Sequence, residues 1–173
     1  PDTDVPGMTY EAPAEEAVVA NNEEVIQEIF HGETSVDTAD ALNTIAENGT
    51  NEMTRVLAKA MLAGMPTTGH NMPINSVPGL VSDQDANKTI GGAYYPNSHS
   101  IDINTALSKY AVEKIILHEI SHGFTVRHIN NNPAARAKIT ALMDYAKGVF
   151  TSAQLERFKY QMQNEEEFIA GAL

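Results

Sequence analysis

The residues best suited to chemistry form the run HEISH, from His118 to His122, within the segment KIILHEISHGFTVRHI. The run matches the pattern H-E-x-x-H. On a helix, side chains four positions apart lie one above the other, so His118 and His122 can face one ion, while Glu119 lies about 100° around the axis. Neutral imidazoles bind zinc, zinc lowers the pKa of a water ligand, and a nearby glutamate can take the proton as that water attacks a carbonyl. The run therefore predicts a zinc site with Glu119 as general base.

The helix that carries this run is predicted to be central, because apolar residues cover nearly all its sides. The face of the two histidines also carries Ala111, Ile115, Thr125 and Ile129, and the opposite side carries Val112, Ile116, Ile120 and Phe124. Burying a polar group without a partner costs roughly 1–3 kcal/mol. This cost favours a metal over the alternative, in which the two histidines are core residues held by ordinary hydrogen bonds.

One candidate for a third ligand is His128. Metzincins extend the motif to H-E-x-x-H-x-x-G-x-x-H, and His128 occupies the last position. However, Thr125 replaces the glycine at which the chain must leave the helix. If the helix continues, His128 lies about 240° around the axis from His122. It would then be a helix-end residue that interacts favourably with the C-terminal dipole.

The other candidate lies in the segment FKYQMQNEEEFIAGAL, where Tyr160, Asn164 and Glu167 recur at spacings of four and three, as on one face of a helix. Together with H-E-x-x-H, the run N-x-x-E-F-x-A resembles the gluzincins, zinc metallopeptidases whose third ligand is a glutamate on a downstream helix. It is particularly similar to compact domains encoded by bacteriophages and mobile elements within large proteins. The resemblance covers residues 90–173.

This resemblance implies a zincin-like fold, Zn²⁺ as cofactor and a peptide or protein substrate. It implies that His118, His122 and Glu167 are the metal ligands, that Glu119 is the general base, and that Asn164 lies near the site as a second-shell helper. Peptide-bond hydrolysis by a zinc-activated water is the activity it predicts.

Two features of the C-terminal segment leave alternatives open. Glu165 and Glu166 precede Glu167 directly, and only one of the three can face the zinc on a helix; Glu166 is the reserve for the ligand role. Gluzincins also commonly have an acidic residue shortly after the third ligand, whereas this chain reads IAGAL there. Either another group orients the histidines, or the chain is a degenerate zincin-like module with a binding or structural role in a phage or mobile-element protein.

The segment AYYPNSHSIDIN is predicted to be a hairpin, with strands at 93–95 and 100–104. In zincins, extended substrate adds to the edge strand beside the active-site helix, so Ala93, Tyr94 and Tyr95 are predicted to bind substrate through their backbone. The alternative is an ordinary hairpin that caps the core. A tyrosine often stabilises the oxyanion in this chemistry; Tyr160 is the first candidate and Tyr145 the second.

The remaining pattern predicts a mainly helical α+β domain with a small, edge-exposed sheet. Helices are expected at about 23–30, in two parts over 35–66 with a break at ENGTN, and at 106–129, 133–147 and 152–172. The stretch 66–92 is expected to be mostly loop with one short strand. In the second of these two helices, the residues at core spacing are Met53, Val56, Leu57, Ala60 and Met61.

Composition limits the functional classes. The chain has 173 residues, a net charge of -12 and no cysteine, which argues against nucleic acid and membrane surfaces as partners and leaves only His, Asp or Glu to hold a metal. Neither a signal peptide nor a membrane-spanning run is present, so we expect a soluble chain. The sequence leaves its location open, and association with a virion and a host cytoplasm are the two options that the resemblance to phage-encoded domains suggests. Residues 1–24 are predicted to be an acidic flexible arm and residues 25–173 a single domain, a fragment of a larger multidomain protein.

Overall fold

The structure, a computed structural model, describes residues 8–10, 22–50, 52–65, 71–83, 85–106 and 109–171. Two compact units are distinguished within the chain, residues 1–120 and 121–173. The division falls inside one continuous helix, so the prediction of a single domain over residues 25–173 stays a prediction. The secondary structure is mixed α+β, as expected.

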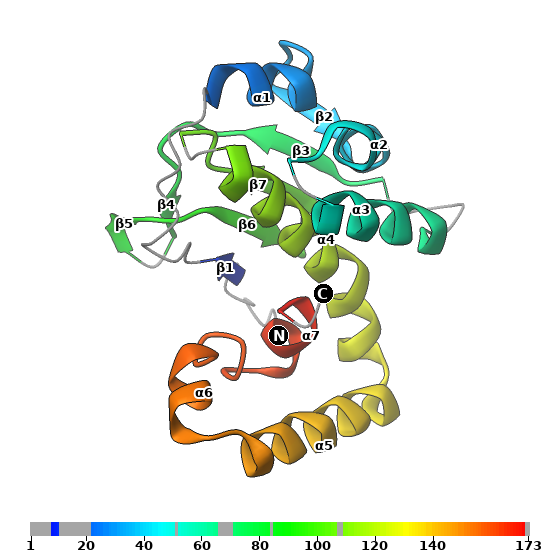
Figure 1. Cartoon of the computed structure of the whole chain (residues 1–173), viewed down its shortest axis with the longest axis vertical. Helices are drawn as coiled ribbons and strands as arrows, with labels where there is room; N and C mark the ends of the chain where they lie inside the picture. The colour runs from blue at the N-terminus through cyan, green and yellow to red at the C-terminus, as the bar shows by residue number, and fades with distance from the viewer. Residues whose placement is uncertain are drawn as a thin grey trace. The chain divides into compact units, whose positions relative to one another are not determined.

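The first unit is built on a five-stranded mixed sheet with the order β1-β6-β7-β3-β2 (Figure 1). Only the β3–β7 pair is parallel; the other pairs are antiparallel. Its strands are β1 (Met8–Tyr10), β2 (Ser35–Asp37), β3 (Pro73–Ser76), β6 (Gly92–Tyr95) and β7 (Ser100–Ile103). The strands β4 (Val81–Ser82) and β5 (Asp85–Thr89) form a separate two-stranded sheet.

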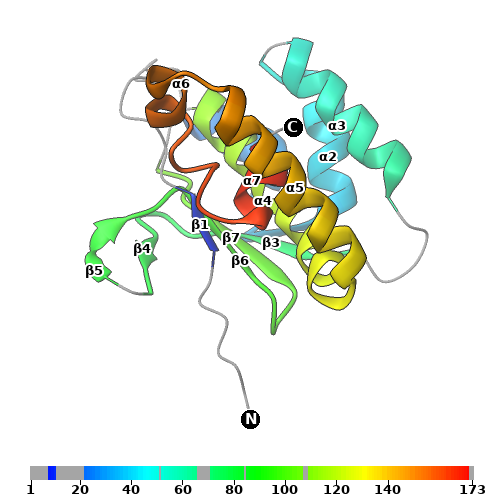
Figure 2. The ribbon, with the colours of Figure 1, turned by 90° about the horizontal axis from the view of Figure 1, so that it is seen from below.

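Helices lie on one side of the five-stranded sheet, as Figure 2 shows for α2, α3 and the first part of α4. The helices of this unit are α1 (Asn22–Phe30), α2 (Thr38–Asn48), α3 (Glu52–Gly64) and the first half of α4 (Lys109–Asn131). Their apolar side chains and those of the strands form the core, whose largest fully buried members include Phe30, Leu42, Ile45, Ile74, Tyr94, Ile101, Ile115 and Ile116. Because successive strand residues face opposite sides of a sheet, Ala93 packs on the other side, against Leu80 and Ile90.

The second unit contains the end of α4 and the helices α5 (Pro133–Val149), α6 (Ser152–Arg157) and α7 (Glu165–Ala170). The predicted break at NNNP is confirmed: Asn132 accepts a hydrogen bond from the N–H of Ala135, and Pro133 occupies the first turn of α5, where its missing N–H costs nothing. In the described part of the chain, no helix combines the length and the apolar content needed to cross a membrane.

The hairpin and the helices at 22–30, 38–48, 52–64, 109–131 and 133–149 agree with the predicted elements, but the sheet is larger than expected. Residues Met8–Tyr10, predicted to belong to a flexible arm, form strand β1; the other residues of that arm before Asn22 lie outside the described ones. β2 and two of the three strands within residues 66–92 were also unexpected. Such strands of two to five residues carry too little periodicity to be recognised.

Two predicted helical features are wrong. In α3 the buried residues are Thr54 and Ala58, whereas Met53 and Val56 are 64% and 52% exposed. The apolar stripe has helical spacing, but α3 turns an adjacent, smaller-residue face to its neighbours. The predicted helix over 152–172 is instead α6 and α7, separated by turns at residues 158–164. The intrinsic propensity of this stretch is therefore overridden by tertiary structure.

Glu113, a fully buried residue of α4, links this helix to the loop between α2 and α3. The backbone N–H of Thr50 donates to both of its carboxylate oxygens, at 3.1 and 3.0 Å, and the Thr50 hydroxyl donates to Oε2. Hydrogen bonds to a buried carboxylate satisfy a group that would otherwise be costly to remove from water. This interaction fixes the first half of α4 against the loop before α3.

We predict that Glu113→Ala lowers the free energy of unfolding by about 2 kcal/mol, because it leaves the N–H and hydroxyl of Thr50 without their acceptor. Urea unfolding measured by circular dichroism provides the test. The matched control is Glu47→Ala, at an exposed position of α2, which should change stability by no more than about 0.5 kcal/mol. Equal effects of the two substitutions would contradict the prediction.

Candidate metal centre

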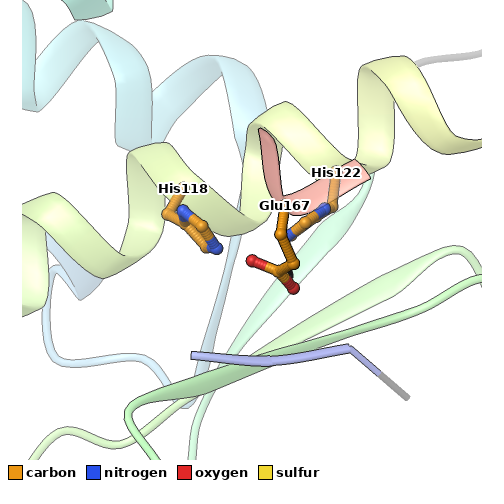
Figure 3. A group of neighbouring side chains, drawn as sticks. All are labelled: His118, His122 and Glu167. Atoms are coloured by element: carbon orange, nitrogen blue, oxygen red, sulfur yellow. Dashed lines mark ion pairs between the residues drawn. The ribbon is translucent and has the colours of Figure 1, made fainter. Parts of the chain in front are cut away.

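Three buried side chains, those of His118, His122 and Glu167, offer ligand atoms that all lie within 4.8 Å of one another (Figure 3). The Nε2 atom of His122 and the Oε1 atom of Glu167 are 3.5 Å apart. The two histidines belong to α4 and the glutamate to α7. The ligand set expected from the sequence is thus the set that the structure brings together.

Helix α4 sets the spacing of the two histidines because it continues without interruption through both. The predicted burial on nearly all sides is observed from Val112 to His122; the side chain of Ala111 lies outside those described. At Thr125, where a metzincin would have its glycine, the hydroxyl donates to the carbonyl of Ser121 at 2.7 Å and the helix goes on to Asn131. His128 is therefore in the last turn and exposed, outside the ligand group.

The neighbouring glutamates of α7 are engaged by α5. Arg136 lies 2.9 Å from Oε1 of Glu166 and 3.5 Å from Oε2 of Glu165, and the Thr140 hydroxyl donates to Glu165 at 2.8 Å. The hydrogen bond from Thr140 is the main cause that lowers the pKa of Glu165, and Arg136 adds to it. Because Glu165 and Glu166 face α5, the next residue, Glu167, is directed elsewhere on this short helix, where it meets His122.

Asn164 begins α7 and acts on Glu167 through the backbone. Its side-chain oxygen accepts a hydrogen bond from the N–H of Glu167 at 2.8 Å, which makes it the N-cap of the helix. The expected helical face shared by Asn164 and Glu167 is wrong, because Asn164 precedes the helix as its cap. Its expected role as a helper near the site stays a prediction. Tyr160, the expected oxyanion residue, lies in the turns before the helix and is half-buried, and its catalytic role stays a prediction, as does that of the exposed Tyr145.

The donor set fits zinc. Two imidazoles and one carboxylate are the ligands of many catalytic zinc sites, which leave a fourth position open. Bonds of about 2.0–2.1 Å in a tetrahedron place ligand atoms about 3.3–3.4 Å apart, close to the 3.5 Å between His122 and Glu167. A divalent cation would also balance the charge of the buried Glu167 carboxylate, which is costly to keep in an apolar interior.

Glu119 is fully buried, and the backbone of β6 approaches it closely. A methyl group at Gly92 would lie 3.0 Å from Cγ of Glu119, 3.2 Å from its Oε1 and only 2.6 Å from a side-chain methyl of Ile115. Only glycine leaves room for these two side chains. No role was predicted for Gly92 from the sequence, where it directly precedes the strand predicted at 93–95; the available signal was that a glycine in or beside a strand often marks a close approach of another group.

The predicted substrate-binding residues lie on β6, which is not an edge strand. Its outer side pairs with β1, so the expectation of an exposed edge at Ala93, Tyr94 and Tyr95 is wrong. Ala93 and Tyr94 are buried, and the Tyr94 hydroxyl is 2.9 Å from Nδ1 of His99. Burial, with smaller contributions from Asp102 and other carboxylates, raises the pKa of the half-buried Tyr95 to about 12, so its hydroxyl stays protonated at neutral pH.

Comparisons of the chain with protein-family models, with curated proteins and with solved structures find no match. Function is therefore argued from the residues of the site themselves.

We predict that Gly92→Ala destabilises the protein by about 1–3 kcal/mol, because the added methyl group forces Ile115 and Glu119 to move within a packed core. Chemical unfolding provides the measurement. Gly148→Ala is the matched control, since nothing lies within 4 Å of a methyl group at that helical position and alanine is favoured there by about 0.5–1 kcal/mol. A Gly92→Ala protein as stable as the wild type would show that β6 and Glu119 do not pack this closely.

A second prediction concerns the cap of α7. Asn164→Ala removes the acceptor for the N–H of Glu167 and should weaken zinc binding by about tenfold, the lower end of the range for groups that orient a ligand. Asn164→Ser retains a side-chain oxygen that can cap the helix and should restore most of the affinity. Competition with a chromophoric zinc chelator measures both values. If serine and alanine weaken binding equally, the cap does not act through Glu167.

Proposed function

We propose that the chain is a zinc-dependent metallopeptidase with a zincin-like fold, in which His118, His122 and Glu167 hold the metal. The observation that carries the proposal is the approach of Glu167, from a separate helix 45 positions after His122, to within 3.5 Å of that histidine. The pattern H-E-x-x-H alone arises by chance in some helices, but a chance pattern does not require a buried carboxylate from a distant segment beside its second histidine.

Zinc bound by these residues would supply a Lewis acid that polarises a carbonyl and lowers the pKa of water. The side chains near the zinc would hold and transfer the protons of the reaction. Glu119 follows the first histidine directly and is the general base: it accepts a proton from the attacking water and then passes it to the leaving amine. Burial of this carboxylate, with Gly92 packed against it, keeps its orientation fixed through the reaction, which is the form of preorganisation that proton transfer requires.

The second candidate function is a degenerate zincin-like module that binds a partner. The observation that favours it is the absence of an acidic residue from the segment IAGAL after Glu167, because such a residue commonly orients a ligating histidine. The two functions share the zinc ligands and differ in the role of Glu119, which would be catalytic only in the peptidase.

We predict that the wild-type chain binds a single zinc ion and cleaves unfolded protein substrates such as casein, and that His118→Ala, His122→Ala and Glu167→Ala each lose tight zinc binding. His128→Ala is the matched control and should retain it, since His128 is exposed and lies outside the ligand group. Glu119→Gln should retain zinc but lose cleavage by a factor of about 10²–10⁴, because the amide cannot accept the proton. Metal analysis after dialysis and release of labelled peptides provide the two readouts.

The combined result separates the candidates. Zinc binding without cleavage of any unfolded protein or peptide library would exclude the peptidase and support the binding module. Loss of zinc in His128→Ala, with retention in Glu167→Ala, would show that the ligand set is wrong. Cleavage by Glu119→Gln at the wild-type rate, with unchanged zinc content, would remove Glu119 from the reaction.

A further inference from the structure

Strand β1 occupies the outer side of β6. The two run antiparallel, with Met8 opposite Tyr94, Thr9 opposite Ala93 and Tyr10 opposite Gly92, and β1 lies beside β6 in both ribbon views (Figures 1 and 2). β1 is the last strand of the sheet on this side. The backbone groups of β6 that would otherwise be open to an incoming chain are therefore paired with a segment from the N-terminal part of the same chain.

The partner strand β6 passes close to the predicted general base. Gly92 packs against Glu119, and Gly92 is also the residue paired with Tyr10. A strand that pairs with β6 at Gly92 is therefore separated from Glu119 only by β6 itself. An extended peptide can add at this side of the sheet by main-chain hydrogen bonds. The position is filled by three residues of the protein itself.

The pairing is short. An edge strand of three residues contributes few ladder hydrogen bonds, and such segments open with low free energy compared with the rest of a fold. A short edge strand can leave without unfolding the four strands behind it.

We propose that β1 is an internal, substrate-like strand: it covers the peptide-binding side of β6, and an extended peptide binds antiparallel to β6 in its place. The identification of that peptide as a substrate rests on the proposed function. The exchange of strands itself does not require catalysis. While β1 is paired, the chain inhibits itself. Displacement of β1, or its removal by proteolysis, opens the site.

The test measures binding of a dye-labelled peptide with the sequence of residues 5–12, VPGMTYEA, to the full-length chain by fluorescence anisotropy. All proteins carry Glu119→Gln so that the probe is not cut. Thr9→Pro/Tyr10→Pro removes a ladder hydrogen bond, because alternate residues of a strand direct their N–H toward the neighbouring strand and one of the two must do so. The matched control, Thr3→Pro, places proline in the same segment but outside β1.

We expect the double variant to bind the probe about tenfold more tightly than the control. This factor applies if β1 is paired in about nine-tenths of the control molecules, because only the remaining tenth can bind the probe. A second variant, Thr9→Gly, keeps the N–H but weakens the strand and should shift the affinity in the same direction by a smaller factor. A scrambled peptide of the same composition should bind all proteins equally weakly. Equal affinities for the double variant and the control, or no binding of the probe to either, would overturn the proposal.

Failure of this inference is distinguishable from failure of the proposed function. For this comparison, cleavage is measured in proteins that retain Glu119. If the wild-type chain cleaves its substrate, Thr9→Pro/Tyr10→Pro cleaves no faster and the probe affinities are equal, the chain is a peptidase without self-inhibition. Tighter probe binding by the double variant, with no cleavage by any protein, would leave a strand-exchange site without the peptidase.

Discussion

Burial of polar side chains on α4 is the constraint on which the rest of the structure depends. Four ionisable residues of this helix, Glu113, His118, Glu119 and His122, are at most 7% exposed. Removing such groups from water is unfavourable unless other groups compensate. A helix with this composition is stable in a protein interior only if specific partners are brought to it, and several features of the chain that have no obvious local purpose supply them.

The partners come from segments far apart in sequence. The loop at Thr50 donates hydrogen bonds to Glu113, the glycine at the start of β6 makes space for Glu119, and α7 carries Glu167 to His122. The last of these depends in turn on α5, since Arg136 and Thr140 hold the two preceding glutamates and thereby set the rotation of the short helix. A run of three glutamates thus has divided roles, two that position the helix and one that faces the histidines.

Strand β6 likewise has several roles in the sheet. β6 contributes to the core through Tyr94 and to the packing of Glu119 through Gly92, and its outer side is paired with β1. β1 takes up the backbone groups on that side of β6, and its own outer side becomes the edge of the sheet. The same pairing would regulate access to a neighbouring site. One set of backbone hydrogen bonds thus extends the sheet and, in the proposed mechanism, controls access to the site.

Much of the candidate site could be predicted from the sequence, because a helix places residues four apart on one face whatever surrounds it. That rule alone relates His118 to His122, and the continuous pattern through Thr125 predicts that His128 is turned away, as observed. The break at Asn132 and Pro133 and the hairpin at β6 and β7 were predictable for the same reason, since turn and cap residues act locally.

Tertiary structure alone decided the rest. Local pattern could not show that residues 158–164 leave the helix, that Asn164 is a cap, or that Arg136 holds Glu166 and leaves Glu167 for His122. Nor could it show that the exposed face of α3 would carry Met53, or that three residues of an expected arm would pair with β6. The sequence determined which chemical groups are present and their spacing along each helix; long-range packing and strand pairing decided which of them meet, because those contacts depend on residues tens of positions apart.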